Sequence, residues 1–380
     1  MKSIIYLDYA AATPLDPTVL ESMRPYFSEH FYNPSAVYLS ARSVQRDLET
    51  ARSTIAVVLG SKPSEIIFTA GGTEANNLAI RGVMEEFPGS NIVLSSIEHD
   101  SVIGPAKLYK NKLASISPDG IINIPKLLAM IDDQTVLVSV MYCNNEVGSI
   151  QPIHKIAEAL EQVKKTRAEK GNKLPLYFHS DAAQAGNYLD LHVSRLGIDL
   201  MTINGSKIYG PKQSGALYIR TATRLKPQIF GGGQEFGVRS GTENVAADIG
   251  LASALGFAQQ KRLEESKRLA ELQTIFIKLL QEKIPGVVIN GSLKQRVVNN
   301  VHITLPGQDN ERILMQLDEA GILAAAGSAC SASSAEPSHV LKAMGINKSD
   351  AQASIRFTMG RQTDLAAVQK TVDVLSSLPI

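Results

Sequence analysis

A lysine at the end of an apolar run is the first residue that could do chemistry. Lys207 follows the run Leu200–Asn204 after two small residues, Gly205 and Ser206. A lysine in a cleft at the end of a buried strand can lose its proton through desolvation and then form a Schiff base with a carbonyl compound. Because ordinary surface lysines are far commoner, this pattern alone leaves both roles open.

Two other segment ends carry groups that could bind a charged ligand. Gly71, Gly72 and Thr73 separate an apolar run from a helical pattern, and backbone N–H groups at a helix start can bind phosphate. The lysine of a Walker A loop is absent, and a helix capped by Thr73 is the simpler alternative. Asp181 follows the run Leu176–Ser180, where open α/β sheets bind ligands. Its carboxylate could hold a cationic ring nitrogen or cap a helix.

The two cysteines of the chain have different surroundings. Cys330 lies within Ala324–Ala335, a segment rich in glycine, serine and alanine that predicts a loop. An exposed thiol there could be a nucleophile, whereas a buried thiol would be inert. Cys143 follows the buried run Thr135–Met141, so we expect it to be structural.

Unbroken apolar runs alternate with helical patterns in the first two thirds of the chain, as expected for strands buried on both faces. The expected strands are Ile66–Ala70, Asn91–Ser95, Thr135–Met141, Leu176–Ser180, Leu200–Asn204 and Gly215–Arg220. The expected helices are Ser43–Leu59, Thr73–Glu86, Pro125–Ile131 and Pro152–Glu169. This alternation predicts a three-layer α/β fold with a mainly parallel sheet. Gly215–Arg220 follows its predecessor too closely for a helical crossover, which favours an antiparallel strand.

A long helical pattern from Val245 to about Lys283 predicts a helix that connects two domains. Beyond it the sequence predicts a smaller α+β domain. Its expected elements are strands near Val287–Asn290, Val301–Leu305 and Gln352–Thr358, and helices at Asn310–Ala320 and from about Asp364. We expect residues 15–256 to form the large domain, and residues 1–14 with 257–380 to form the small domain that carries the Cys330 loop.

Composition excludes several classes of protein. The net charge of +1 gives no sign of a nucleic-acid or anionic-membrane partner, and 44% apolar with 20% charged residues fits a folded globule. Two cysteines are too few for a disulfide scaffold or a four-cysteine zinc site, and we expect no metal. There is no signal peptide pattern and no apolar run of about 18 residues, so we expect a cytoplasmic protein.

Seven motifs in this order resemble those of the NifS/IscS-type cysteine desulfurases, a group within the class V aminotransferase family. The resemblance runs from Tyr6–Pro14 to Ser354–Gly360. It implies PLP fold type I, the aspartate aminotransferase-like fold, with a three-layer α/β large domain and a smaller α+β domain. The segment Gly327–Cys330 resembles the group of desulfurases that has the longer catalytic loop.

The resemblance implies pyridoxal 5′-phosphate (PLP) as the cofactor. Lys207 matches the lysine that forms the Schiff base, and Asp181 matches the acid that pairs with the pyridine nitrogen. Gln184 matches a residue near the phenolic oxygen, and His99 matches a histidine stacked on the ring. The cofactor-binding positions implied are Gly72, Thr73, His99, Asn145, Asp181, Gln184, Asn204, Ser206, Lys207 and Thr242.

The substrate and partners are implied in the same way. Asn145 and Arg356 match the pair that holds the carboxylate of L-cysteine, and Asn33 lies in the motif at the entrance. Thr242 matches a residue that reaches the phosphate of the partner subunit, which implies a homodimer.

The resemblance also implies a reaction, with Lys207, Cys330 and His99 at the catalytic positions. L-Cysteine leaves as L-alanine, and its sulfur becomes a persulfide on Cys330. The persulfide is then passed to an acceptor protein, either an iron–sulfur scaffold or a tRNA-thiolation enzyme. No direct nucleic-acid or membrane partner is expected.

Two positions depart from the family pattern, and three other functions compete with this one. Ser206 stands where the family commonly has a histidine before the lysine, and Tyr38 replaces a histidine near the entrance.

A selenocysteine lyase shares the fold and chemistry, and a non-catalytic PLP-fold scaffold subunit would fit the departures. A cysteine hydrolase would need a base for Cys330, for which His302 and His339 are the candidates.

Overall fold

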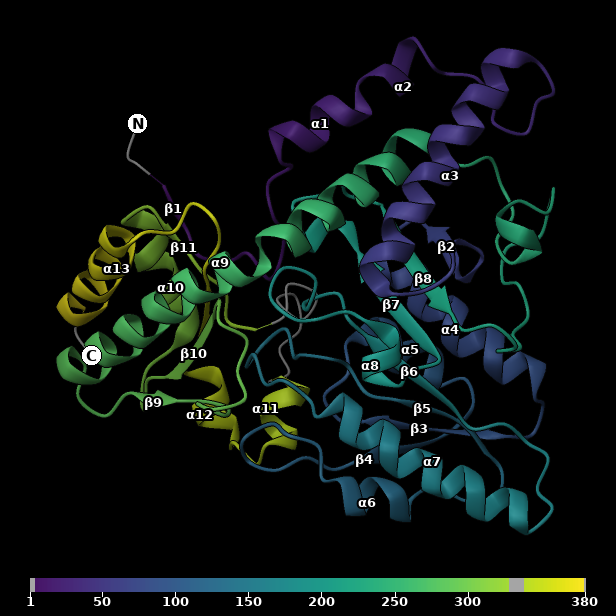
Figure 1. Cartoon of the computed structure of the whole chain (residues 1–380). Coiled ribbons are helices and arrows are strands. Elements are labelled where there is room, and N and C mark those ends of the chain that lie inside the picture. Colours follow the sequence, from purple (N-terminus) through teal and green to yellow (C-terminus); the bar gives the residue numbers. More distant parts are fainter. Residues whose placement is uncertain (1–3, 328–337, 379–380) are drawn as a thin grey trace.

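A computed structural model of the chain describes residues 4–327 and 338–378 (Figure 1). Its centre is a seven-stranded sheet with the strand order β2-β8-β7-β6-β5-β3-β4. The strands are β2 (Ile66–Thr69), β3 (Asn91–Ser95), β4 (Lys110–Ala114), β5 (Thr135–Ser139), β6 (Tyr177–Asp181), β7 (Leu200–Asn204) and β8 (Gly215–Ile219). β8 runs antiparallel to both of its neighbours, β2 and β7, and all other pairs of this sheet are parallel. The expected mainly parallel sheet and its antiparallel strand are confirmed.

Alternate side chains of the strands pack into two separate cores. Ile66 and Phe68 of β2 belong to the core shared with α3 (Leu39–Leu59) and α7 (Ile153–Glu169). Ile67 belongs to the opposite core, shared with α4 (Gly72–Glu86) and α5 (Asp100–Ala106). Helices therefore cover both faces of the sheet, which gives the three-layer arrangement. Two short helices, α6 (Ile124–Ala129) and α8 (Val193–Leu196), complete this part.

A second, antiparallel sheet with the order β12-β10-β9 lies on the left in Figure 1. Its strands are β9 (Val288–Ile289), β10 (Asn300–Thr304) and β12 (Ser354–Thr358). The helices of this part are α10 (Asn310–Glu319), α11 (His339–Ala343), α12 (Lys348–Gln352) and α13 (Leu365–Ser377). Strands and helices mix here without a parallel crossover pattern, as expected for the smaller α+β unit.

A single helix of 39 residues, α9 (Val245–Lys283), runs between the two parts (Figure 1). Its N-terminal part lies beside α1 (Pro17–Met23) and α3, and a short helix α2 (Pro25–Ser28) follows α1. Its C-terminal end reaches α13, where Lys283 and Asp373 form an ion pair of 2.6 Å. We propose that the boundary between the large and small domains lies inside α9, near residue 256.

The N-terminal segment joins the two sheets. Strand β1 (Ile5–Tyr6) pairs in parallel with β11 (Ile322–Leu323), and Asp8 forms a bridge with Thr358 of β12. Farther along, the N–H and hydroxyl of Thr13 both donate to the carbonyl of Ser206, just beyond β7. The segment therefore crosses from the small sheet to the end of the large sheet, and its backbone can form a wall of any site there.

Some elements differ from the sequence expectation. β4 was not expected, because its residues Lys110, Asn111 and Lys112 are polar and lie on an edge strand with exposed side chains. Helix α5 was missed because Gly104 and Pro105 lie inside it. Helix α4 begins one residue early, and Gly71 with φ +105° is its N-cap in place of Thr73.

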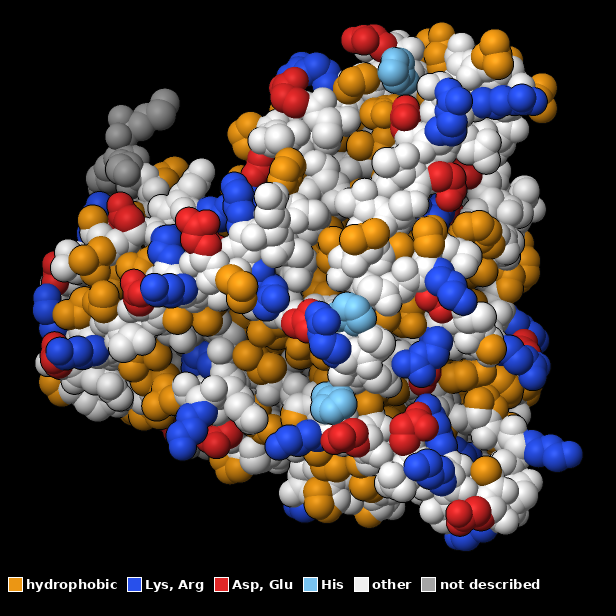
Figure 2. Space-filling view, in the orientation of Figure 1, with side chains coloured by type: hydrophobic (Ala, Val, Ile, Leu, Met, Phe, Trp, Pro, Cys, Tyr) orange, Lys and Arg blue, Asp and Glu red, His pale blue; other side chains and the backbone are white. Residues whose placement is uncertain are grey.

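The surface in Figure 2 shows acidic and basic side chains mixed over the visible face, without a field of one sign. This mixture agrees with the nearly balanced charge of the chain. Among the residues that the structure describes, no helix has both the length and the apolar character needed to cross a membrane.

Candidate active site

One pocket gathers most of the residues that the sequence singles out. It opens beyond the carboxyl ends of β6 and β7, where the N-terminal segment passes over the large sheet. The predicted residues that line it are Gly72, Thr73, His99, Asn145, Asp181, Gln184, Asn204, Lys207 and Arg356. They come from segments spread over nearly 300 positions, and the strand ends bring them together, as the position rule for open α/β sheets requires.

One end of the pocket is built for an anion. Helix α4 starts there, and the first N–H groups of a helix have no partner inside it. A side chain at Gly71 would be strained by the φ of +105°, and a Cβ on Gly72 would lie 3.2 Å from the Asn204 side chain. Only small residues therefore leave room for a ligand against the amides of Gly72 and Thr73. This cradle fits the phosphate of PLP.

Asp181 ends β6, and its side chain accepts two hydrogen bonds. The N–H of Ala183 donates to Oδ1 at 2.9 Å, and Asn76 Nδ2 donates to Oδ2 at 2.7 Å. Both contacts suit a carboxylate, which only accepts hydrogen bonds. Behind it, His179 is buried between Ser139 and Thr202, and burial lowers its pKa to about 4, so it stays neutral at pH 7. Asp181 is thus the charged group of this wall, which suits a protonated pyridine nitrogen.

Lys207 ends a short turn of 3-10 helix, η2 (Gly205–Lys207), directly after β7. Its Nζ donates to the carbonyl of Ala11, which brings the amine to the wall made by the N-terminal segment. Gln184 donates to the neighbouring carbonyl of Ala10 at 3.0 Å. The backbone of residues 10 and 11 therefore orients both side chains at the same edge of the pocket.

Arg356 in β12 closes the pocket from the small sheet, and 1% of its surface is exposed. Its Nη1 donates to the carbonyl of Asn145 at 3.0 Å, and its Nη2 donates to Asp8 Oδ1 at 2.6 Å. Its Nε has no partner within the described part of the chain. Burial lowers the pKa of His302, the residue opposite Arg356 on β10, to about 3, so this imidazole is neutral and adds no positive charge beside Arg356. A buried guanidinium with an unused N–H suits a carboxylate.

Three predicted residues lie away from this pocket. Asn33 is exposed, and its side chain accepts from the N–H of Ser35. Thr242 is exposed on the loop before α9, and Ser206 is turned to Asn204 Oδ1, 3.0 Å away. Tyr38, one of the departures from the family pattern, is the exposed N-cap residue of α3. Within one chain these residues are not among those that line the pocket, and Cys330 lies outside the described residues.

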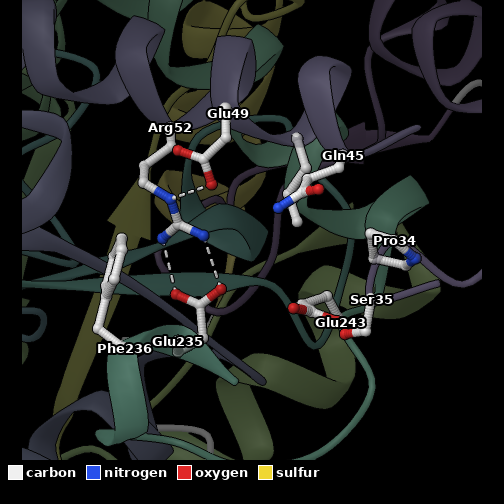
Figure 3. A pocket seen from close by; sticks show the side chains of 9 residues that line it. Pro34, Ser35, Gln45, Glu49, Arg52, Glu235, Phe236 and Glu243 are labelled. Carbon is white, nitrogen blue, oxygen red and sulfur yellow. Dashed lines mark hydrogen bonds and ion pairs between the residues drawn. The ribbon is translucent and has the colours of Figure 1, made fainter. Parts of the chain in front are cut away.

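The loop that carries Thr242 is held by a buried ion pair (Figure 3). Arg52 of α3 donates from Nη1 and Nη2 to Glu235, at 2.7 and 2.8 Å, and both side chains are nearly inaccessible. Glu235 also accepts from the N–H of Phe68 in β2. Glu235 and Phe236 adopt positive φ values of +47° and +58°, so this clamp fixes an unusual backbone at the loop's base.

Four lining residues were missed as functional candidates or given a different role. Asn76 and Ser101 join Asp181 to His99 by hydrogen bonds, and Ala11 receives Lys207. Cys143 lines the pocket but is buried, and desolvation raises the pKa of its thiol, so it remains a protonated wall residue. For Asn76, the sequence offered only its position as a signal: it lies one helical turn past Gly72 and therefore on the same face of α4.

Comparisons with known proteins agree with this geometry. The profile of the family described as Aminotransferase class-V matches residues 5–371. Cysteine desulfurase IscS of Dictyoglomus turgidum is 39% identical over 385 residues, which cover 100% of this chain and 95% of that protein. Cysteine desulfurase IscS of Methanosarcina thermophila is 37% identical, covering 98% of this chain and 91% of that protein.

Solved structures give the same result. The X-ray structure of a NifS-like protein from Rickettsia africae has a TM-score of 0.87 at 30% identity, and the match covers 98% of each chain. The structure of SspA in complex with cysteine has a TM-score of 0.80 at 34% identity, covering 94% of this chain and 99% of that one. The chain therefore belongs to the aminotransferase class-V family, among the cysteine desulfurases of the NifS/IscS type.

Proposed function

We propose that this PLP-dependent cysteine desulfurase converts L-cysteine to L-alanine by transferring the sulfur of the substrate to Cys330. The observation that carries the proposal is the single pocket in which Lys207, Asp181 and Arg356 come together from three separate segments. The names of the desulfurase relatives support the activity, and the complex of SspA with cysteine supports the substrate.

The pocket offers one group for each part of the cofactor. The amides of Gly72 and Thr73 would hold the phosphate beside Asn204, and Asp181 would accept from the pyridine N–H. Gln184 would donate to the phenolic oxygen. When bound, PLP withdraws electrons from the Cα of the amino acid attached to it, which makes bonds around that carbon easier to break.

Lys207 has two tasks in this proposal. Its amine would bind the aldehyde carbon of the cofactor, and L-cysteine would then displace it. The released amine is the base that would take the Cα proton, because Lys207 lines the same pocket as Arg356 and Asn145, which would hold the substrate carboxylate. His99 would lie on the ring face, opposite the amine.

Cys330 would receive the sulfur as a thiolate. Its Sγ attacks the substrate sulfur, an S–S bond forms, and the C–S bond breaks with its electron pair left on the substrate carbon. That carbon takes a proton and becomes the methyl group of alanine. The sum is L-cysteine plus the Cys330 thiol giving L-alanine plus the Cys330 persulfide, with no external oxidant or reductant.

A second copy of the chain and a sulfur acceptor are the partners we infer. The loop with Thr242 carries Phe230 and Phe236 with 80% and 59% of their surfaces exposed. Such apolar exposure supports contact with another subunit, which would bring Thr242 to the phosphate of its partner's site. The acceptor is an iron–sulfur scaffold or a tRNA-thiolation enzyme. A cytoplasmic location is inferred because thiols persist in that reducing compartment.

One experiment tests the reaction directly. The purified holoenzyme is incubated with L-cysteine, alanine is counted, and the persulfide is located by mass spectrometry. We expect one persulfide at Cys330 and none at Cys143, whose buried thiol is an internal control. Cys330→Ala should keep the yellow cofactor and lose alanine release. Persulfide on Cys143, or normal turnover by Cys330→Ala, would contradict the mechanism.

A further inference from the structure

A buried asparagine stands between the two polar groups on either side of the cofactor site. Asn76 lies in α4, and 1% of its surface is exposed. Its Nδ2 is 2.7 Å from Asp181 Oδ2 and 2.8 Å from Ser101 Oγ. Its Oδ1 is buried and has no partner within the described part of the chain. The side chain thus uses both of its N–H groups and leaves its oxygen unused.

The orientation of this amide is determined by Asp181. A carboxylate only accepts hydrogen bonds, so the NH₂ group of Asn76 must face it. The flipped amide would place Oδ1 against the Asp181 oxygens and bring two acceptors together. Since an NH₂ group has two hydrogens, the second one is directed to Ser101 Oγ.

The same reasoning extends to the imidazole of His99. The backbone N–H of Ser101 lies 3.1 Å from His99 Nδ1, and Ser101 Oγ lies 2.8 Å from the same atom. A backbone N–H can only donate, so Nδ1 is an acceptor and the proton of the neutral ring is on Nε2. Because Ser101 Oγ accepts from Asn76, its own hydrogen is free to donate to Nδ1.

We propose that Asn76 is a positioning residue for both sides of the site: through one amide it orients Asp181 directly and, by fixing Ser101 Oγ, adds a second hydrogen bond to Nδ1 of the His99 ring. His99 then presents a proton donor to the pocket, and Asp181 presents a charged acceptor. This inference rests on the proposed function, because it gives Asp181 and His99 the ring-binding places assigned there.

The first test compares Asn76 with its neighbour. Asn77 is half-buried on the same helix, and among the described residues its Nδ2 donates to the carbonyl of Thr73. Asn76→Asp removes the donor to Asp181 and puts a second carboxylate beside it, so we expect the dissociation constant for PLP to rise at least tenfold. Asn77→Asp adds the same charge and should change it less than twofold. Equal constants for the wild type and Asn76→Asp would overturn the proposal.

The second test observes the tautomer in the holoenzyme. Long-range ¹H–¹⁵N NMR of histidine-labelled protein separates protonated from unprotonated ring nitrogens, and His99→Gln assigns the signals. We expect an unprotonated Nδ1 and a protonated Nε2 in the wild type. Asn76→Ala and Ser101→Ala should keep this tautomer and shift the Nδ1 signal, because the backbone N–H of residue 101 remains while the hydroxyl hydrogen bond is lost or no longer held in place. A protonated Nδ1 in the neutral wild-type ring would contradict the proposal, and this result does not depend on whether any variant folds.

The two proposals fail in different ways. If the wild type binds PLP and releases alanine while the Nδ1 signal of His99 is the same in both variants as in the wild type, only the Asn76 inference is wrong. If the wild type does not form the yellow species, the proposed function is wrong. Thermal unfolding of Asn76→Ala and Asn76→Asp, measured beside Asn77→Ala, separates a positioning effect from a general loss of stability.

Discussion

Arg356 and Asp8 form an ion pair of 2.6 Å between Nη2 and Oδ1, although 348 positions separate them in the chain. The arginine belongs to β12, and the aspartate belongs to the N-terminal segment that crosses to the large sheet. With Nη1 held by the carbonyl of Asn145, two of the three nitrogens of the guanidinium are fixed by the protein. Each Nη carries a second N–H, and Arg356 lines the pocket, so we assign its guanidinium to the substrate carboxylate.

The planar geometry of Arg356 should matter more than its charge. Arg356→Lys keeps the positive charge but loses the planar guanidinium with its fixed set of N–H donors. We therefore expect the KM for L-cysteine to rise about 10- to 100-fold, as for the loss of a charge-assisted hydrogen bond worth roughly 1.5–3 kcal/mol. Arg361→Lys is the matched control, because Arg361 pairs with Asp16 at 2.7 Å outside the pocket. Steady-state kinetics measure both. A KM for Arg356→Lys within twofold of the wild type would place the carboxylate site elsewhere.

Covalent attachment of the cofactor distinguishes Lys207 from its neighbour. Lys207 and Lys212 both donate to carbonyls of the N-terminal segment, but only Lys207 lines the pocket. Reduction with borohydride should fix PLP to the wild type and to Lys212→Ala, and not to Lys207→Ala. Mass spectrometry of the intact protein reads the added mass. Attachment that survives in Lys207→Ala would refute the assignment.

The clamp of Arg52 and Glu235 should dominate the stability of the region around the Thr242 loop. Arg52→Met leaves the Glu235 carboxylate buried without its cation, which costs about 3–5 kcal/mol for an ion pair of this kind. Arg24→Met breaks the exposed pair with Glu21, which water and salt screen, and should cost far less stability. Denaturant unfolding at pH 7 compares them. Equal losses in the two variants would show that burial of the pair has no effect.

Two buried histidines should make the fold sensitive to acid. Burial lowers the pKa of His179 to about 4 and that of His302 to about 3, whereas an unfolded histidine has a pKa near 6.5. As the pH falls from about 6.5 to about 4, the unfolded chain binds protons that the folded chain does not, so the free energy of unfolding falls.

Replacing one of these histidines tests that dependence. His179→Gln should remove its share of the difference between urea midpoints at pH 7.5 and pH 5. His154→Gln, at an exposed position of α7, should keep the wild-type difference. If His179→Gln and the wild type lose the same stability between the two pH values, another group controls the acid response.

The sequence predicted those strands and helices whose pattern of apolar residues is visible within the segment itself. The run Leu200–Asn204 and the helix Val245–Lys283 appear with the expected bounds, because unbroken burial and a helical period are visible in the sequence itself. The polar edge strand β4 has no such pattern, since its burial is set by the neighbouring β3 alone.

Site residues that directly follow the end of a strand could be predicted from the sequence. Residues whose role depends on a contact with a distant segment could not. Lys207 and Asp181 end strands or turns, so their positions were visible in the sequence. Asn76 acquires its role only because α4 packs over the end of β6, and the partner of Arg52 comes from a loop 183 positions away. No spacing rule links such pairs, because the sheet order that joins them is a property of the whole fold.

The crossing of the N-terminal segment also sets the order in which the site can be assembled during synthesis. Residues 5–8 leave the ribosome well before their partners in β11 and β12, which lie more than about 300 positions later in the chain. Long-range pairing of this kind has to wait for both strands. The wall that orients Lys207 and Gln184 therefore closes only when translation has passed residue 358, about 150 positions after Lys207 itself is made.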